Sequence, residues 1–200
     1  MIHNVSFNLW DFMKRQLSAM DYKVIPNIHL CSETPDPFTI ITQSIAYPKP
    51  STAVESSDSS PFVIAIFISG LCHDLHTLYT TYGLVDIIDD IIQPFLPQSA
   101  PHLQHIPKLF FITAEGDPDA PAPPHFPDDP NGNYCVAYHV TNKLCHMVKW
   151  AQYITDHIFS PNITIQEVIE KSRSSLFKHM EQLHCRNCLK NRLILNCHNK

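Results

Sequence analysis

Thiol and imidazole side chains that could act together occur at Cys72, with His73 and His76 close behind it. A cysteine protease needs such a pair, because the imidazole takes the thiol proton and leaves a nucleophilic thiolate. The segment is polar and follows a strongly apolar run, so we expect a solvated loop here. A catalytic pair at Cys72 is therefore the less favoured interpretation.

A second group of thiols and imidazoles lies near the C-terminus and contains a Cys-x-x-Cys spacing, which suits tetrahedral zinc. The group consists of His184, Cys185, Cys188, Cys197 and His198. A zinc ribbon usually brings a second spaced cysteine pair, which this stretch lacks. We therefore expect no metal site and no cofactor, and keep a metal-dependent hydrolase as an alternative.

Carboxylates gather at two further places. Asp86, Asp89 and Asp90 recur opposite a row of isoleucines, which is typical of the solvated face of an amphipathic helix rather than of a cation site. A proline-rich segment carries the other group, Asp117, Asp119, Asp128 and Asp129. This acidic loop is a candidate for cleavage by a protease that cuts after aspartate.

The composition limits the classes of protein to which the chain can belong. Of its 200 residues 44% are apolar, which suffices for the core of one domain. The 14 basic and 19 acidic side chains form no block of like charge, so we expect neither nucleic acid nor a membrane as partner. Seven cysteines without a readable secretory signal predict reduced thiols and a cytoplasmic protein.

Helical spacing and continuous apolar runs alternate along the first half of the chain. Helices are predicted over residues 6–20 and 36–45, with a strand at 22–25 between them and a polar loop at 47–61. Phe62–Ile68 and Lys108–Ile112 are apolar runs of strand length, and Leu84–Phe95 carries the isoleucine stripe of a helix. This order predicts a largely parallel sheet covered by helices on both faces.

The second half continues this alternation after an interruption. Asp117–Pro130 contains six prolines and four aspartates, so regular structure is excluded there. The predicted elements that follow are a strand over Tyr134–Val140, a helix over Leu144–Ile158, a helix up to Leu176 that starts at a capping box of Thr164 and Glu167, and a closing strand over Cys188–Leu195.

Several of these stretches together resemble the caspase family, and they occur in that family's order. Pro61–Ser69 is similar to the strand before its Ser-His-Gly motif, and Tyr79–Gly83 to its Tyr-Gly-Thr-Asp-Gly turn. Ile106–Ile112 is similar to the strand that delivers its Gln-Ala-Cys-x-Gly nucleophile turn. Cys135–Tyr138 resembles the start of its small subunit, and Gln182–Leu193 its Gln-Met-Pro and Lys-Lys-Leu segments.

The resemblance implies a fold and a division of the chain. The fold is a caspase-like three-layer α/β sandwich, with a mostly parallel central sheet flanked by helices on both faces. Within one domain, residues 1–116 are similar to the large subunit, 117–132 to the acidic linker between subunits and 133–200 to the small subunit.

The resemblance also implies what stands at the catalytic positions. Gly70 falls where the family has its histidine, and Glu115, or Ala114 if one residue is deleted, falls where it has its cysteine. None of these residues supplies a thiol or an imidazole. The two arginines that bind the substrate aspartate in the family have no counterpart either. A catalytically inactive homologue, not an enzyme, is therefore expected.

A partner follows from the same resemblance. In caspases the last strand pairs two catalytic domains across a twofold axis, and the matching residues here are Cys185, Cys188, Leu189, Arg192 and Leu193. We expect a heterodimer with an active caspase, in the manner of FLICE-like inhibitory proteins and insect decoy caspases, that regulates apoptosis or immune signalling. Self-association without a caspase partner is the alternative.

Overall fold

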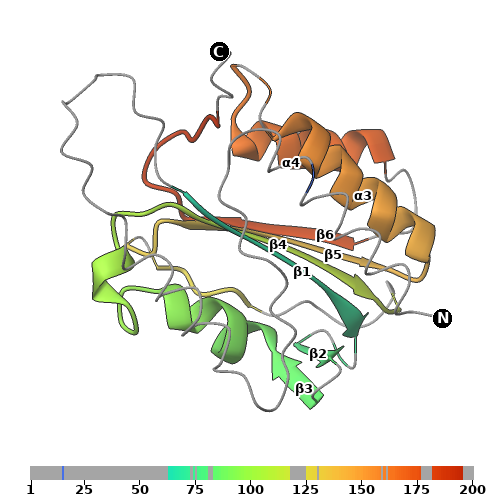
Figure 1. Ribbon diagram of the computed structural model, residues 1–200, viewed down its shortest axis with the longest axis horizontal. Coiled ribbons are helices and arrows are strands. Elements are labelled where there is room, and N and C mark those ends of the chain that lie inside the picture. Colours follow the sequence, from blue (N-terminus) through green and yellow to red (C-terminus); the bar gives the residue numbers. More distant parts are fainter. Residues whose placement is uncertain are drawn as a thin grey trace.

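The computed structural model describes Arg15 and residues 63–72, 74, 76–80, 83–117, 125–129, 131–158, 160, 162–176 and 182–195. These residues form one six-stranded sheet with helices on both of its faces (Figure 1). The predictions for residues 6–20, 22–25, 36–45 and 47–61 lie outside this part of the chain, except that Arg15 is helical.

The sheet has the strand order β3-β2-β1-β4-β5-β6. The strands are β1 (Ile64–Cys72), β2 (Thr77–Thr80), β3 (Gly83–Asp86), β4 (Lys108–Glu115), β5 (Tyr134–Thr141) and β6 (Gln182–Asn187). The central strands β1, β4 and β5 run parallel, whereas β2, β3 and β6 are antiparallel to their neighbours. The predicted α/β sandwich is confirmed, with a sheet that is mixed because β2 and β3 follow β1 through connections too short for a parallel crossover.

One face of the sheet is covered by the short helices that follow β3. They are the π-helix η1 (Ile87–Ile92) and the 3-10 helices η2 (Gln93–Phe95) and η3 (Pro101–Leu103). Their apolar side chains pack against Phe110, Ile112 and Ala114 of β4 and against the matching positions of β1 and β5. Alternate residues of the central strands therefore form this core.

The other face is covered by α3 (Leu144–His157) and α4 (Ile165–Leu176). Leu109 and Phe111 of β4 point to this side, where Phe111 contacts Trp150 of α3 with ring centroids 6.4 Å apart. Both faces of β4 and β5 are thus buried, which explains why Lys108–Ile112 and Tyr134–Val140 are largely apolar without alternation.

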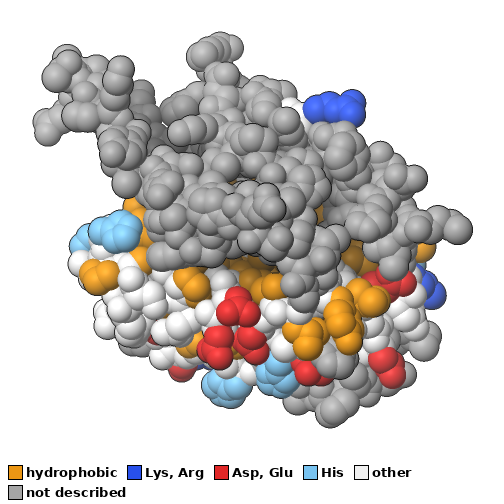
Figure 2. Space-filling model, turned by 60° about the horizontal axis from the view of Figure 1, so that its bottom comes forward, with side chains coloured by type: hydrophobic (Ala, Val, Ile, Leu, Met, Phe, Trp, Pro, Cys, Tyr) orange, Lys and Arg blue, Asp and Glu red, His pale blue; other side chains and the backbone are white. Residues whose placement is uncertain are grey.

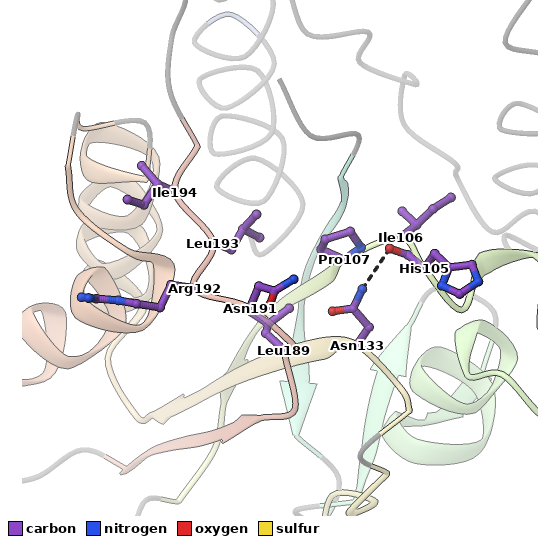
Figure 3. Close-up of a pocket in the computed structure, with 9 residues that line it drawn as sticks. All are labelled: His105, Ile106, Pro107, Asn133, Leu189, Asn191, Arg192, Leu193 and Ile194. Carbon is purple, nitrogen blue, oxygen red and sulfur yellow. Dashed lines mark hydrogen bonds between the residues drawn. The ribbon is translucent and has the colours of Figure 1, made fainter. Parts of the chain in front are cut away.

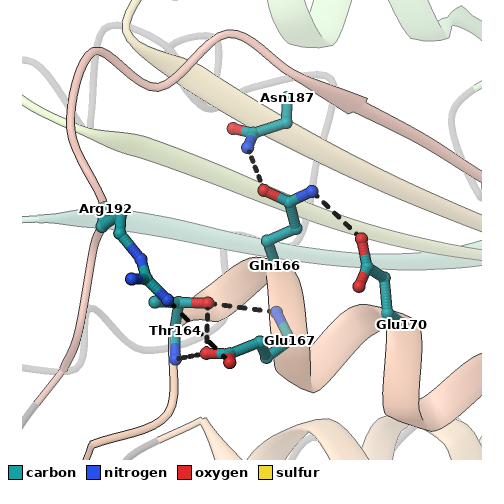
Figure 4. A network of polar contacts seen from close by, with 6 residues as sticks. All are labelled: Thr164, Gln166, Glu167, Glu170, Asn187 and Arg192. Atoms are coloured by element: carbon teal, nitrogen blue, oxygen red, sulfur yellow. Dashed lines mark hydrogen bonds and ion pairs between the residues drawn. The ribbon is translucent and has the colours of Figure 1, made fainter.

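The capping box predicted for α4 is present. The Thr164 hydroxyl accepts a hydrogen bond from the Glu167 backbone N–H at 3.2 Å, and the Glu167 carboxylate accepts one from the Thr164 backbone N–H at 2.8 Å. Glu167 also lies 3.9 Å from Arg192, and Gln166 links Glu170 to Asn187 by hydrogen bonds of 3.0 Å (Figure 4). This network ties the start of α4 to the chain that follows β6.

Three predicted elements differ from the structure. Leu84 belongs to β3 and is exposed, so the helix begins only at Ile87. Asp86 is not on a solvated helix face but caps η1, because its carboxylate accepts from the backbone N–H groups of Ile88 and Asp89. The closing strand is Gln182–Asn187 rather than Cys188–Leu195, because antiparallel pairing with β5 places Asn187 opposite Cys135, near the start of β5.

Candidate functional site at the carboxyl ends of the central strands

The positions that the resemblance matches to the family's catalytic residues lie together. Gly70 of β1 is paired with Ala114 of β4, and Leu71 is paired with Glu115. Val140 and Thr141 of β5 lie on the other side of β4, opposite Ala114 and Glu115. We call this region the carboxyl edge; ligands of open α/β sheets bind outside this end of the strands.

The register distinguishes the two positions considered for the cysteine. Paired residues share a face of the sheet and successive residues alternate, so Ala114 lies on the same face as Gly70, and Glu115 lies on the opposite face. A nucleophile and a base must lie within hydrogen-bond reach of each other. Of the two, only position 114 could have formed such a pair with position 70.

Gly70 lies directly beside β2. A Cβ atom added at Gly70 would lie 3.3 Å from Cβ of Leu78 and 3.4 Å from the carbonyl oxygen of Tyr79. Leu78 is fully buried. Any side chain at this position would therefore be crowded by β2 from its first atom.

Glu115 belongs to a strand and not to the turn that the resemblance implied. β4 continues through Glu115 because β1 and β5 extend equally far and pair with it on both sides. The backbone N–H of Gly116 then donates to the carbonyl oxygen of Thr141 at 2.9 Å. This N–H is committed to the sheet and is not free to bind an oxyanion, which in acyl transfer needs preorganised donors.

Among the described thiols, that of Cys72 lies directly beside the carboxyl edge. It ends β1, and a Cβ atom added at Gly116 would lie only 2.7 Å from Cβ of Cys72, so the ends of β1 and β4 approach closely because residue 116 is glycine. The Cys72 thiol donates to the carbonyl oxygen of Asp74 and lies 3.6 Å from the Tyr138 hydroxyl. Sequence reasoning assigned Cys72 to a solvated loop, but the residue is half-buried in a strand.

The surroundings of Cys72 keep its thiol protonated. Burial raises its pKa, the nearby Asp74 carboxylate raises it further, and the hydrogen bond with Tyr138 opposes both. Within the described part of the chain, the hydrogen-bond partners of Cys72 are Asp74 and Tyr138 and include no histidine. Because the thiolate is the reactive form, this environment does not activate the sulfur.

Residues 125–129, within the predicted linker, pack on the sheet. Phe126 is buried and meets Tyr138 edge to face, with ring centroids 6.4 Å apart. The Tyr134 hydroxyl donates to the carbonyl oxygen of Pro127, and Asp128 forms an ion pair with Arg186 of β6. This part of the linker crosses from β4 to β5 against the face that η1 also covers.

The linker aspartates consequently differ in their surroundings. Asp129 accepts hydrogen bonds from Gln98 at 3.0 Å and from the backbone N–H of Asn131 at 2.8 Å. Asp128 is exposed but paired with Arg186, Asp117 is exposed, and Asp119 lies outside the described residues. Cleavage after any of these aspartates stays a prediction.

The residues expected at a dimer interface fall into two groups. Cys185 lies on β6 and is exposed, and β6 is the last strand of the described sheet. Leu189, Arg192 and Leu193 follow β6 and line a pocket of about 520 Å³ together with His105, Ile106, Pro107, Asn133, Asn191 and Ile194 (Figure 3). The pocket lies at the amino ends of β4 and β5, away from the carboxyl edge.

The C-terminal thiols do not gather around a common point in the described part of the chain. His184 and Cys185 are successive strand residues and point to opposite faces of the sheet. Among the described residues no cluster of three or more histidine, cysteine or acidic side chains could hold a metal ion. Cys197 and His198 lie outside these residues.

An exposed apolar group lies on β1, β2 and β3, and no sequence motif indicated it. Leu71, Tyr79 and Leu84 are 41%, 46% and 51% exposed, and the strand register places them side by side across β1, β2 and β3. Acidic side chains group on the side of the molecule shown in Figure 2, with hydrophobic ones beside them. The cross-strand alignment of these residues follows from the β2–β3 hairpin, which the sequence did not predict.

None of the helices described here is long and apolar enough to cross a bilayer.

The comparisons with known proteins bear on the fold. No family model and no curated protein sequence matches the chain. Among solved structures, caspase-1 from Spodoptera frugiperda matches with a TM-score of 0.59 and 15% identity, over 96% of this chain and 82% of that one. The structure of pro-sf-caspase-1 matches with a TM-score of 0.56 and 17% identity over the same shares. With its parallel centre, its antiparallel β6 and its two helical layers, this chain has a caspase-like fold.

Proposed function

We propose that this chain is a non-catalytic caspase homologue that pairs with an active caspase through the open edge of β6 and changes that caspase's activity. The observation that carries the proposal is the carboxyl edge. Gly70, Ala114 and Glu115 stand at the implied catalytic positions, and the strands there pair with one another without leaving a turn. None of these three residues offers a thiolate or an imidazole to a peptide bond.

The backbone of β6 supports the proposed mode of pairing. The Cys188 N–H donates to the carbonyl oxygen of Tyr134, so by alternation Arg186 and His184 are the residues whose backbone groups bond inward to β5. The backbone N–H and C=O groups of Cys185 then point away from β5, to the side of β6 on which the described sheet has no further strand. An unpaired strand edge is a template for a strand of another molecule.

Pairing of this kind can act on a caspase in two ways. It supplies contacts that order the partner's active-site loops, or it occupies the partner's edge without completing an active pair. Apoptosis or immune signalling in the cytoplasm is the setting we propose. Either an increase or a decrease of the partner's activity agrees with the proposal.

The decisive experiment combines binding with activity. Each caspase of the same cell is titrated with the full chain, and complex formation is followed by light scattering while cleavage of an aspartyl peptide is recorded. We expect a one-to-one complex and a changed cleavage rate with at least one caspase. Cleavage of the peptide by the chain alone, or no effect on any caspase, would contradict the proposal.

Two variants of one residue separate edge pairing from other contacts. Cys185→Pro removes an N–H from the open side of β6 without breaking a bond to β5, and we expect at least about tenfold weaker caspase binding. Cys185→Ala keeps this N–H and should bind like the unaltered chain. Equal binding by both variants would show that the caspase does not pair with the edge of β6. A homodimer of the chain that is lost in Cys185→Pro would instead favour self-association.

A further inference from the structure

Two thiols meet across β5 and β6, and the proposed pairing uses the backbone of one of them, Cys185, but neither thiol side chain. Cys185 lies opposite Ala137 of β5, and Cys135 is two residues before Ala137 on the same face. The thiols are therefore diagonal neighbours on the side of the sheet covered by α3 and α4. Cys185 is exposed, whereas Cys135 is buried in the core.

The two thiols differ in acidity because of their contact. The interaction between the two thiols lowers the pKa of Cys185, against the effect of partial burial, and the same interaction together with burial raises the pKa of Cys135. The charged groups facing Cys185 are on α4, where Arg173 lowers its pKa and Glu170 raises it. An exposed thiol with a lowered pKa beside a second thiol is the usual arrangement of redox-sensing cysteines.

We infer that Cys185 and Cys135 form a peroxide-sensitive thiol pair, in which Cys185 is the oxidised residue and Cys135 the residue that converts it into a disulfide. The inference does not rest on the proposed pairing with a caspase. It requires only the packing of β5 against β6 and an oxidant of the peroxide class.

The reaction has two balanced steps. The Cys185 thiolate attacks one peroxide oxygen, an S–O bond forms, the O–O bond breaks and hydroxide leaves, so the sulfur is oxidised and the peroxide is reduced. The Cys135 sulfur then attacks the Cys185 sulfur, an S–S bond forms, the S–O bond breaks, and the departing hydroxide takes up the Cys135 proton. Two thiols and one hydrogen peroxide give one disulfide and two waters.

The location of the pair predicts a reversible bond. Diagonal cross-strand residues have backbones about 7–8 Å apart, so a disulfide between them requires the two strands to move slightly closer together. β6 has a strand on only one side in the described sheet, so it can shift toward β5 more easily than an inner strand. A disulfide under such strain is reduced readily. Its formation should also displace the start of α4, which the Asn187 to Gln166 hydrogen bond ties to β6.

Peptide mapping of the full chain tests the inference without any variant. The reduced protein is treated with equimolar hydrogen peroxide, free thiols are blocked with iodoacetamide, and a digest is analysed without reduction. We expect a linked peptide pair that contains Cys135 and Cys185 and disappears after reduction. A link between Cys185 and Cys188, or no link involving Cys185, would overturn the inference.

Cys145 provides an internal control, because it is an exposed thiol on α3 of the same molecule. Near neutral pH, Cys185 should react with iodoacetamide at least about threefold faster than Cys145. In Cys135→Ala, dimedone should trap several-fold more sulfenic acid at Cys185 than in the unaltered chain, since the second step is lost. Equal rates for Cys185 and Cys145, or equal dimedone labelling with and without Cys135, would also overturn it.

Discussion

The three parallel strands differ between their middle and their carboxyl ends. In the middle, large side chains such as Phe110, Ile112 and Tyr138 are fully buried and packed from both sides. At the carboxyl ends, Gly70, Ala114 and Gly116 are small, and neighbouring backbones or side chains occupy the space beside them. Packing in the middle requires large side chains that fill the core, whereas packing at the ends requires small residues that let neighbouring strands approach closely. Substitutions should therefore destabilise the middle by leaving cavities and the ends by causing steric clashes.

The largest effect is expected in the middle. Trp150 of α3 contacts Phe111 and His139, and its indole N–H donates to Ser172 at 3.3 Å. Trp150→Ala should lower the free energy of unfolding by about 3–5 kcal/mol, because it leaves a cavity and removes a buried hydrogen bond. Urea denaturation measures this, with Cys145→Ala as an exposed control on the same helix. Similar losses in both variants would show that the core does not lie where we place it.

A second prediction concerns acid. Burial, with a contribution from His146, lowers the pKa of His139 from 6.5 to about 3. In the unfolded chain, His139 is protonated as the pH falls below its ordinary pKa of 6.5, whereas in the folded protein it stays neutral down to about pH 3. The free energy of unfolding therefore decreases as the pH falls from 6.5 to about 3. The slope contributed is about 1.4 kcal/mol per pH unit.

His139→Gln isolates this contribution. The amide can still contact Thr113, which lies 3.3 Å from the His139 ring nitrogen, but it does not titrate. Unfolding measured between about neutral pH and the acid range should therefore decline less steeply in the variant. Parallel curves for the two proteins would contradict a neutral buried His139.

At the carboxyl ends, introducing the histidine and the cysteine of the family pattern should cost stability without producing cleavage. Gly70→His forces a ring against Leu78 and should destabilise the fold by about 1–3 kcal/mol. Combined with Glu115→Cys it should cleave no aspartyl peptide, because the two side chains lie on opposite faces. Glu115→Cys alone is the control and should fold normally. Measurable cleavage by the double variant would mean that the ends are more open than the register allows.

The smallest effect is expected in the turn that holds β2 against Gly70. The Asp74 carboxylate accepts hydrogen bonds from the backbone N–H groups of His76 and Thr77, each at 2.8 Å. Asp74→Ala should lower the unfolding free energy by about 1 kcal/mol, whereas Asp74→Asn keeps an acceptor and should change it less. If the turn positions β2, Asp74→Ala should also reduce the cost of Gly70→His in a double-mutant cycle.

The sequence predicts the middle of the molecule well. Continuous apolar runs at Lys108–Ile112 and Tyr134–Val140, the period of α3 and the capping box at Thr164 all depend on local patterns with strong physical preferences. The sandwich built from them is confirmed. The two strands can be recognised from the sequence because each is buried on both faces and is therefore apolar along most of its length.

The structure at the carboxyl ends of the strands is harder to predict from the sequence. The β2–β3 hairpin and the η1 cap at Asp86 were not predicted. Leu84 has the same spacing as the isoleucines of the following helix, so the sequence pattern places it in that helix and not in a strand. The register that separates Ala114 from Glu115 depends on how far β1 and β5 extend, which no single segment encodes. Cys135 and Cys185 are 50 residues apart in the chain, and only the pairing of β5 with β6 brings them together.

The packing of the linker has a consequence for a protein that has been cut. β4 and β5 are paired along their full lengths, from Lys108 with Tyr134 to Glu115 with Thr141, and Phe126 anchors the chain that leads into β5. A cut between residues 118 and 124 would leave two polypeptides on a denaturing gel but a single particle in gel filtration. Any change in behaviour after such a cut would then come from the new chain ends and not from separation of the halves.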